Sequence, residues 1–101
     1  MSSLGESIKK LREENNLPLR TVASFLDIDQ AILSKMEHGK RLATKDQVKK
    51  LAAYFKTNEK ALLVKWLSDK VLDEIKDEEY ADAALKVAEK QIKYLKKPIK
   101  G

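Results

Sequence analysis

The stretch Leu17–Arg41, LPLRTVASFLDIDQAILSKMEHGKR, decides the fold of this chain. Pro18 permits a helix to begin directly after it, because proline fits the first positions of a helix. Asp29 is a credible N-cap for a second helix, which Gly39 ends. The stretch therefore predicts two short helices joined by a tight turn and followed by a basic loop.

The apolar residues of the two helices recur at helical spacing, which gives each helix one buried face: Val22, Ala23, Leu26, Leu33 and Met36. Ile28 falls in the turn, where it can fill the gap between the helices. The outer face of the second helix is then left with Gln30, Ala31, Ser34 and Lys35, none of which is acidic. Such a face suits contact with phosphates and base edges. The pattern predicts a helix-turn-helix motif whose second helix lies in the DNA major groove.

Four segments in this order and spacing resemble the XRE-like helix-turn-helix family, the type of phage Cro and lambda repressor: IKKLREENNL (8–17), VA before FL (22–26), LSKMEHGKR (33–41) and VKKLAAYF (48–55) leading to ALL (61–63). The resemblance extends from about Leu4 to Leu63. It implies an all-α fold, a five-helix repressor-like domain over residues 1–67 with an additional C-terminal helix in residues 68–101.

The resemblance implies that the start of the second motif helix meets base edges. Gln30 can bond adenine through an acceptor and donor pair, and Lys35 can donate to guanine or to a phosphate. Ala31 and Ile32 offer apolar contact to a thymine methyl, although Ile32 can instead pack against the scaffold. The loop after this helix meets the sugar–phosphate backbone. The expected DNA-binding residues are Arg20, Thr21, Gln30, Ala31, Ile32, Ser34, Lys35, His38, Lys40 and Arg41.

Three residues depart from the family's pattern. Leu19 occupies the place where the first motif helix often carries a glutamine, and Asp27 occupies a turn position often held by glycine. Asp29 adds a second acid at the DNA-facing end, and both acids would repel a phosphate that they faced. Arg20 and Thr21 still lie near a helix N-terminus, where backbone amides can meet a phosphate. A variant of the fold adapted to protein contacts is therefore an alternative.

The rest of the domain also reads as helix. Thr44 and Gln47 have the spacing of a capping box ahead of another apolar face. Thr57 or Asn58 opens a fifth helix. The apolar residues that we expect this helix to bury are Leu62, Leu63, Trp66 and Leu67.

Past Leu67 the family pattern ends. Seven acids and two lysines lie between Asp69 and Asp82, and six lysines and one acid lie between Lys86 and Lys100. Heptad spacing places Leu85, Ala88, Ile92 and Leu95 on one seam, which we expect to be the dimerisation surface. The helix can fold back on its own core or pair with a second copy, and we favour pairing. A two-stranded zipper and a bundle with the fifth helix are both open.

The composition of the chain limits the classes of function that we expect for it. The chain has a net charge of +5, which favours a polyanionic partner. It has no cysteine and a single histidine, so we expect no metal or other cofactor, and the lack of cysteine fits a reducing cytoplasm. No apolar run approaches the ~18 residues of a membrane span, so we expect no membrane contact. The sequence has no glycine-rich phosphate loop and no nucleophile paired with a catalytic base, so we expect that the protein is not an enzyme.

The sequence therefore predicts a cytoplasmic, dimeric, sequence-specific DNA-binding regulator of transcription acting on double-stranded DNA at a palindromic operator. One alternative is an antitoxin that represses its own operon and binds a toxin. The other is a protein-interaction module that uses the same fold without DNA.

Overall fold

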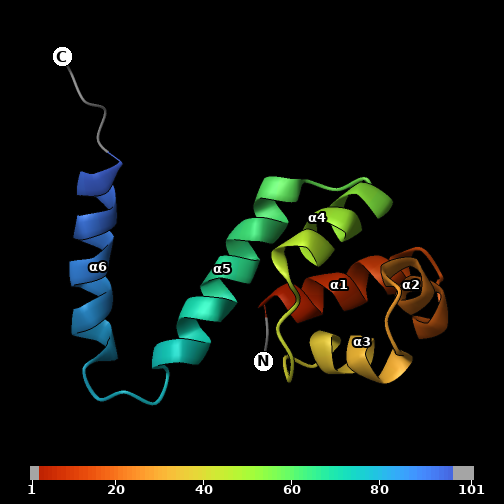
Figure 1. Ribbon diagram of the computed structural model, residues 1–101, viewed down its shortest axis with the longest axis horizontal. Helices are drawn as coiled ribbons and strands as arrows, with labels where there is room; N and C mark the ends of the chain where they lie inside the picture. The colour runs from red at the N-terminus through yellow and green to blue at the C-terminus, as the bar shows by residue number, and fades with distance from the viewer. Residues whose placement is uncertain (1–2, 97–101) are drawn as a thin grey trace.

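The computed structural model describes residues 3–96, which form six helices and no strand. They are α1 (Ser3–Glu14), α2 (Leu19–Leu26), α3 (Gln30–Glu37), α4 (Lys45–Tyr54), α5 (Glu59–Ile75) and α6 (Ala81–Leu95). The first five helices pack together, and α6 stands apart from them beyond the end of α5 (Figure 1). The expected fold, five helices and an additional C-terminal helix, is confirmed.

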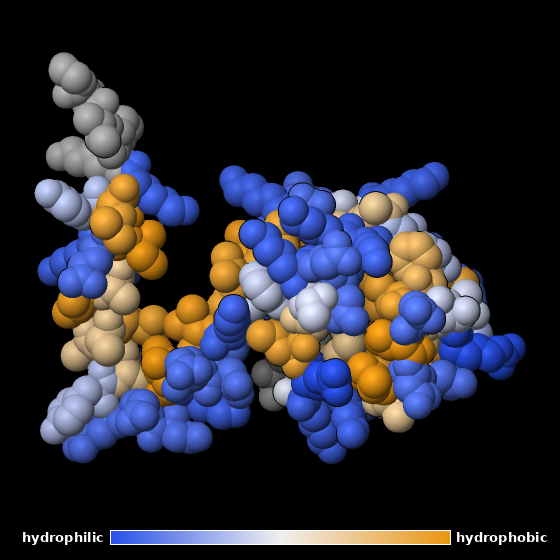
Figure 2. Space-filling model, viewed as in Figure 1, coloured by the Kyte–Doolittle hydropathy of each residue, from blue (hydrophilic) through white to orange (hydrophobic). Residues whose placement is uncertain are grey.

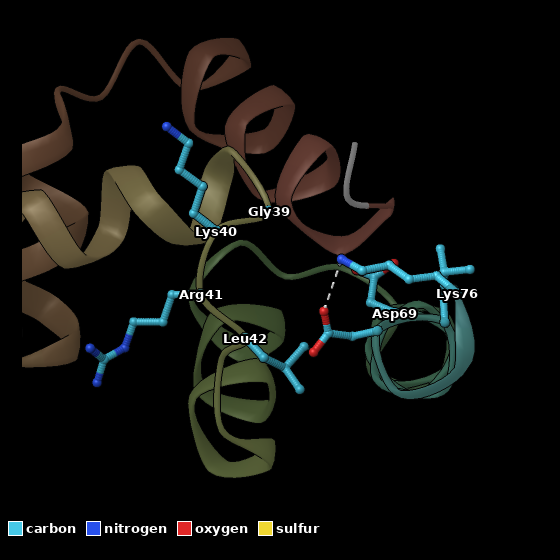
Figure 3. A pocket seen from close by; sticks show the side chains of 8 residues that line it. Gly39, Lys40, Arg41, Leu42, Asp69 and Lys76 are labelled. Atoms are coloured by element: carbon cyan, nitrogen blue, oxygen red, sulfur yellow. Dashed lines mark ion pairs between the residues drawn. The ribbon is translucent and has the colours of Figure 1, made fainter. Parts of the chain in front are cut away.

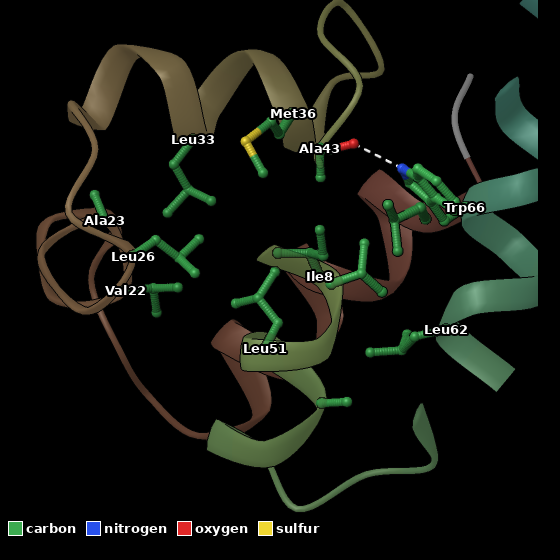
Figure 4. Packing of buried hydrophobic residues seen from close by; sticks show 13 residues of the cluster. Ile8, Val22, Ala23, Leu26, Leu33, Met36, Ala43, Leu51, Leu62 and Trp66 are labelled. Atoms are coloured by element: carbon green, nitrogen blue, oxygen red, sulfur yellow. Dashed lines mark hydrogen bonds between the residues drawn. The ribbon is translucent and has the colours of Figure 1, made fainter. Parts of the chain in front are cut away.

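The core of the five-helix domain is built from the apolar faces that helical spacing predicts. Every one of its helices contributes to it (Figure 4). Leu33, Val48 and Leu51 are completely buried. The full set of buried apolar residues is Leu4, Ile8, Val22, Ala23, Leu26, Leu33, Met36, Ala43, Val48, Leu51, Ala52, Leu62 and Trp66.

Helix ends lie where the capping residues indicate. Thr44 and Gln47 form the expected capping box, with the Thr44 hydroxyl accepting from the Gln47 amide at 3.1 Å and the Gln47 side chain accepting from the Thr44 amide at 2.9 Å. Asn58, rather than Thr57, caps α5 by accepting from the amide of Ala61 at 2.9 Å. These side chains satisfy amides that lack a partner inside the helix.

A buried ion pair joins α1 to α3. Arg12 donates from Nε to Glu37 Oε2 at 2.7 Å and from Nη2 to Glu37 Oε1 at 3.0 Å, and its Nη1 donates to the Leu17 carbonyl at 2.9 Å. The hydrogen bond with Glu37 raises the pKa of Arg12 above its ordinary value. The Glu37 side chain is only 2% exposed, so its charge depends on this one bidentate partner.

Close approach of α1 to the end of α3 requires glycine at position 5. A Cβ built on Gly5 would overlap the backbone carbonyl oxygen of Met36 and lie 2.6 Å from that of Glu37. The clash is with backbone, which cannot swing aside as a flexible side chain can. Gly5 therefore sets the distance between the first helix of the domain and the helix predicted to contact DNA.

α5 continues beyond the point where the family pattern ends. Leu62 and Trp66 are buried as expected and Leu63 is partly buried against the core, but Leu67 is 52% exposed, so its expected burial is wrong. The helix runs on to Ile75, and therefore passes through the proposed domain boundary between residues 67 and 68. Asp69 Oδ2 accepts from the Leu4 amide at 2.9 Å, which ties this second half of α5 to the start of α1.

α6 is an amphipathic helix without a buried residue. It does not fold back onto the domain core (Figure 1). Apolar atoms lie on the side of α6 that faces α5 and on the facing side of α5 itself (Figure 2). Of the two arrangements that the sequence leaves open, packing of α6 back onto its own core does not occur among residues 3–96. No helix among residues 3–96 is long and apolar enough to cross a membrane.

Candidate nucleic-acid interface

The turn between α2 and α3 is held by backbone hydrogen bonds and by Ile28. Asp27 adopts a left-handed conformation with φ of 57°, and its amide donates to the Ser24 carbonyl at 3.1 Å. The Ile28 amide donates to the Ala23 carbonyl at 3.0 Å, and the Ile28 side chain packs against the core. An aspartate tolerates this conformation better than most residues, so the missing glycine does not prevent the turn.

Asp29 is the N-cap of α3, as the sequence predicts, but its side chain makes no capping hydrogen bond. Its backbone carbonyl accepts the first bonds of the helix, from the amides of Ile32 at 3.0 Å and Leu33 at 3.1 Å. The Asp29 carboxylate is therefore an exposed negative charge beside Gln30. Asp27, Asp29 and Gln30 line one shallow hollow together with Arg20 of α2, so the hollow carries both signs of charge.

The outer face of α3 is polar and accessible. Leu33 and Met36 bury the inner face, which leaves Gln30, Ala31 and Lys35 exposed. Ser34 is half-buried. Ile32 is also half-buried and packs against the core, so it belongs in part to the scaffold. The face is thus neutral or basic along its length, with the apolar surface of Ala31 beside the amide of Gln30.

On α2, Arg20 is exposed and Thr21 is half-buried near the N-terminus of the helix. Leu19 is half-buried and packs against the core. The residue in the place of the family's glutamine thus serves the packing of the domain and is only partly available to a ligand.

The basic loop is tied to the end of α3. Gly39 has φ of 74°, and the Lys40 amide donates to the Lys35 carbonyl at 2.8 Å. Lys40 and Arg41 are exposed and extend away from α5 (Figure 3). His38 is exposed, and its Nδ1 lies 2.7 Å from the Ser34 carbonyl oxygen, so Nδ1 is the donor. The loop therefore presents two cations next to the exposed face of α3.

α5 supports this loop from the other side. Trp66 Nε1 donates to the Ala43 carbonyl at 2.6 Å in the core (Figure 4). A cavity of about 260 Å³ separates the loop from the second half of α5, and its lining residues are Gly39, Lys40, Arg41, Leu42, Asp69, Leu72, Asp73 and Lys76. Within it, Lys76 pairs with Asp73 at 3.3 Å (Figure 3).

Sequence reasoning missed the residues that position this surface. Arg12 and Glu37 are separated by 25 residues, and Trp66 and Ala43 by 23. Helical spacing reports neighbours within one helix, so neither pair left a local signal. The placement of Glu37 beside Leu33 and Met36, on the inner side of α3, was the one indication that a partner was needed.

A sequence model of the helix-turn-helix domain matches residues 5–66, so this chain belongs to the XRE-type helix-turn-helix family. The chain is similar to the HTH-type transcriptional repressor RghR of Bacillus subtilis (strain 168), with 36% identity over 66 residues. The alignment covers 64% of this chain and 49% of the relative, so the chain spans about half the length of that protein. No solved structure gives a significant match.

Proposed function

We propose that this chain is a sequence-specific DNA-binding regulator of transcription that acts as a dimer on a palindromic operator. The observation that carries the proposal is the exposed face of α3, which bears Gln30, Ala31 and Lys35 and continues into the cationic loop of Lys40 and Arg41. The family and the name of the similar repressor support it. Such a regulator works in the cytoplasm, together with the DNA.

In this proposal the residues divide into two roles. Lys40 and Arg41 hold phosphates and so fix the orientation of the domain, with Arg20, Thr21 and His38 at the edges of the contact. Gln30 and Lys35 read base edges, while Ala31, Ser34 and the exposed part of Ile32 line the groove. The seam of α6, Leu85, Ala88, Ile92 and Leu95, joins two copies, so that two α3 helices meet half-sites about one helical turn apart, ~10 bp.

The phosphate role predicts a change in salt dependence. Replacing Lys40 and Arg41 together with alanine should weaken binding to all duplexes alike and flatten the slope of log K against log salt by about two units. Fluorescence titrations at several salt concentrations measure this slope. Lys49→Ala with Lys50→Ala on α4 is the matched control, because it removes the same charge elsewhere. An unchanged slope for the loop variant would remove both residues from the phosphate contacts.

The reading role predicts a loss of specificity. Gln30→Ala should cost about 1–3 kcal/mol on the preferred operator and relax the preference at one base pair per half-site. Selection from random duplexes with both proteins measures it. A mutant that returns the same motif with the same information at every position would show that Gln30 reads no base.

Exposed Asp27 and Asp29 favour a second candidate, a protein-interaction module that uses this fold without DNA. Such a module shows no salt-dependent binding to duplex DNA, which the same titration decides. An antitoxin would bind its operator and also copurify with a small partner protein.

Replacing Leu19 with glutamine tests how α2 docks on DNA. Tighter DNA binding by this variant supports a phosphate contact at position 19.

A further inference from the structure

α5 has apolar residues on two opposite sides. Leu62 and Trp66 face the domain core. Val64 lies two residues from each of them, a rotation of about 200° on a helix of 3.6 residues per turn. Val64 is 57% exposed, and Leu67 and Val71 continue the same stripe at 52% and 44% exposed. The domain therefore covers one apolar side of α5 and leaves the other uncovered.

α6 has an apolar face that is too broad for a single neighbour. One stripe is the seam that begins at Leu85. A second stripe lies one residue earlier in each turn, about 100° away, and contains the apolar Ala84 and Val87, the polar Gln91 and the aromatic Tyr94. Both stripes are exposed. An apolar face of this width is suited to contact with two other helices, as in a bundle.

The seam of α6 is symmetric along the chain. Its residues Leu85, Ala88, Ile92 and Leu95 follow one another at spacings of three, four and three, which read the same in both directions around Lys90. Two antiparallel copies would set Leu85 opposite Leu95 and Ala88 opposite Ile92, so that a small residue meets a large one in each central layer. Parallel copies would set Ala88 against Ala88 and Ile92 against Ile92, which leaves one layer thin and the next crowded.

The distribution of charge along α6 also favours antiparallel pairing of two copies. The acidic segment, residues 69–82, holds seven acids and two lysines and ends in the first turn of α6. The rest of α6 and the residue after it carry Lys86, Lys90, Lys93 and Lys96 against Glu89. Antiparallel pairing brings the acidic end of one α6 to the basic end of the other. Parallel pairing would put like charges together, which disfavours that arrangement.

We infer that a second copy of this chain covers these exposed surfaces. The α6 of the second copy lies antiparallel to the α6 of the first, and it packs between that helix and the exposed stripe of the first copy's α5. Each α6 then uses its two stripes, the seam against the other α6 and the second stripe against α5 of the other copy. The inference rests on the proposed dimeric function. It adds Val64, Leu67 and Val71 to the interface, and it specifies the direction and register of the paired α6 helices.

Engineered cysteines test the direction, because the chain contains no cysteine of its own. A disulfide needs Cα atoms within about 7 Å. The full-length variants Leu85→Cys and Leu95→Cys, mixed under mild oxidation, should form a mixed disulfide between the two chains, while each variant alone should cross-link at least tenfold less. Lys90→Cys, on the opposite face of α6, is the matched control and should not cross-link.

Two results would overturn the antiparallel register. Leu85→Cys cross-linking with itself as readily as in the mixture indicates a parallel pair. A second copy is excluded as the occupant if the unmodified chain sediments as a monomer at about 100 μM and no mixture forms a cross-link. Both readouts are made without DNA, so they succeed or fail independently of DNA binding.

A charge on the α5 stripe tests the remaining part of the inference. Val71→Glu should raise the dimer dissociation constant at least tenfold in analytical ultracentrifugation, because it places a carboxylate in the apolar contact. Lys49→Glu, exposed on α4, is the control and should leave the constant unchanged. Val71→Ser removes apolar surface without adding charge and should act in the same direction, more weakly. Unchanged dimerisation of both Val71 variants, with circular dichroism showing intact helices, would exclude α5 from the interface.

Discussion

Leu51 on α4 and Leu85 on α6 are both leucines on the apolar face of an amphipathic helix, yet Leu51 is 0% exposed and Leu85 is 43% exposed. The five-helix domain covers the core-facing sides of its helices with one another, whereas α6 has a comparable apolar face that nothing among residues 3–96 buries. Helical spacing therefore shows which side of a helix is apolar. It does not show whether the covering surface belongs to the same chain.

The largest effect is expected where the domain buries a charge. Arg12→Ala should destabilise the domain by about 3–5 kcal/mol, because it leaves the Glu37 carboxylate buried without its partner. Urea unfolding followed by circular dichroism measures the change. The double variant Arg12→Met with Glu37→Leu is the control and should recover most of the loss. A small effect of Arg12→Ala alone would mean that Glu37 reaches water when its partner is removed.

The two leucines give the direct comparison. Leu51→Ala should cost about 2–5 kcal/mol of unfolding free energy, because it leaves a cavity in a closed core. Leu85→Ala should change the unfolding free energy by less than about 0.5 kcal/mol, provided that the protein is dilute enough to be monomeric. The same urea titration serves both variants. Comparable losses at both positions would show that α6 packs against the domain in solution.

The smallest effect is expected from removing α6 altogether. A chain ending at Asp77 should unfold within about 0.5 kcal/mol of the full chain at the same dilution, because α6 contributes no buried residue. It should also be monomeric by sedimentation. If the shortened chain is still dimeric at micromolar concentration, α6 is not the main pairing element and the exposed stripe of α5 is sufficient.

Local signals predicted most of the fold. The Thr44–Gln47 capping box and the Asn58 cap were predictable because their partners lie three residues away. The burial of Leu33 and Met36 followed from helical spacing. The expected burial of Leu67 was wrong, because nothing in the local sequence distinguishes an apolar residue that faces the core from one on another side of a continuing helix.

The candidate site was predictable only in part. Exposure of Gln30, Ala31 and Lys35 followed from the periodicity of α3, and their contact with DNA stays a prediction. The supports of the site depend on pairs that are distant in sequence, such as Trp66 with the Ala43 carbonyl and Asp69 with the Leu4 amide. Such pairs are fixed by the packing of helices on one another, so a single sequence does not reveal them.

The continuity of α5 has a consequence for operator choice. Its 17 residues make a rod about 25 Å long in which Trp66, held by the core, and Val71, in the proposed interface, cannot turn independently. One residue inserted between them would rotate the interface by about 100° relative to the domain. In the proposed pair, the separation and phase of the two α3 helices are thus set by a helix and not by a tether. The rigid pair would therefore discriminate between operators by the spacing of their half-sites, in addition to any discrimination by base contacts.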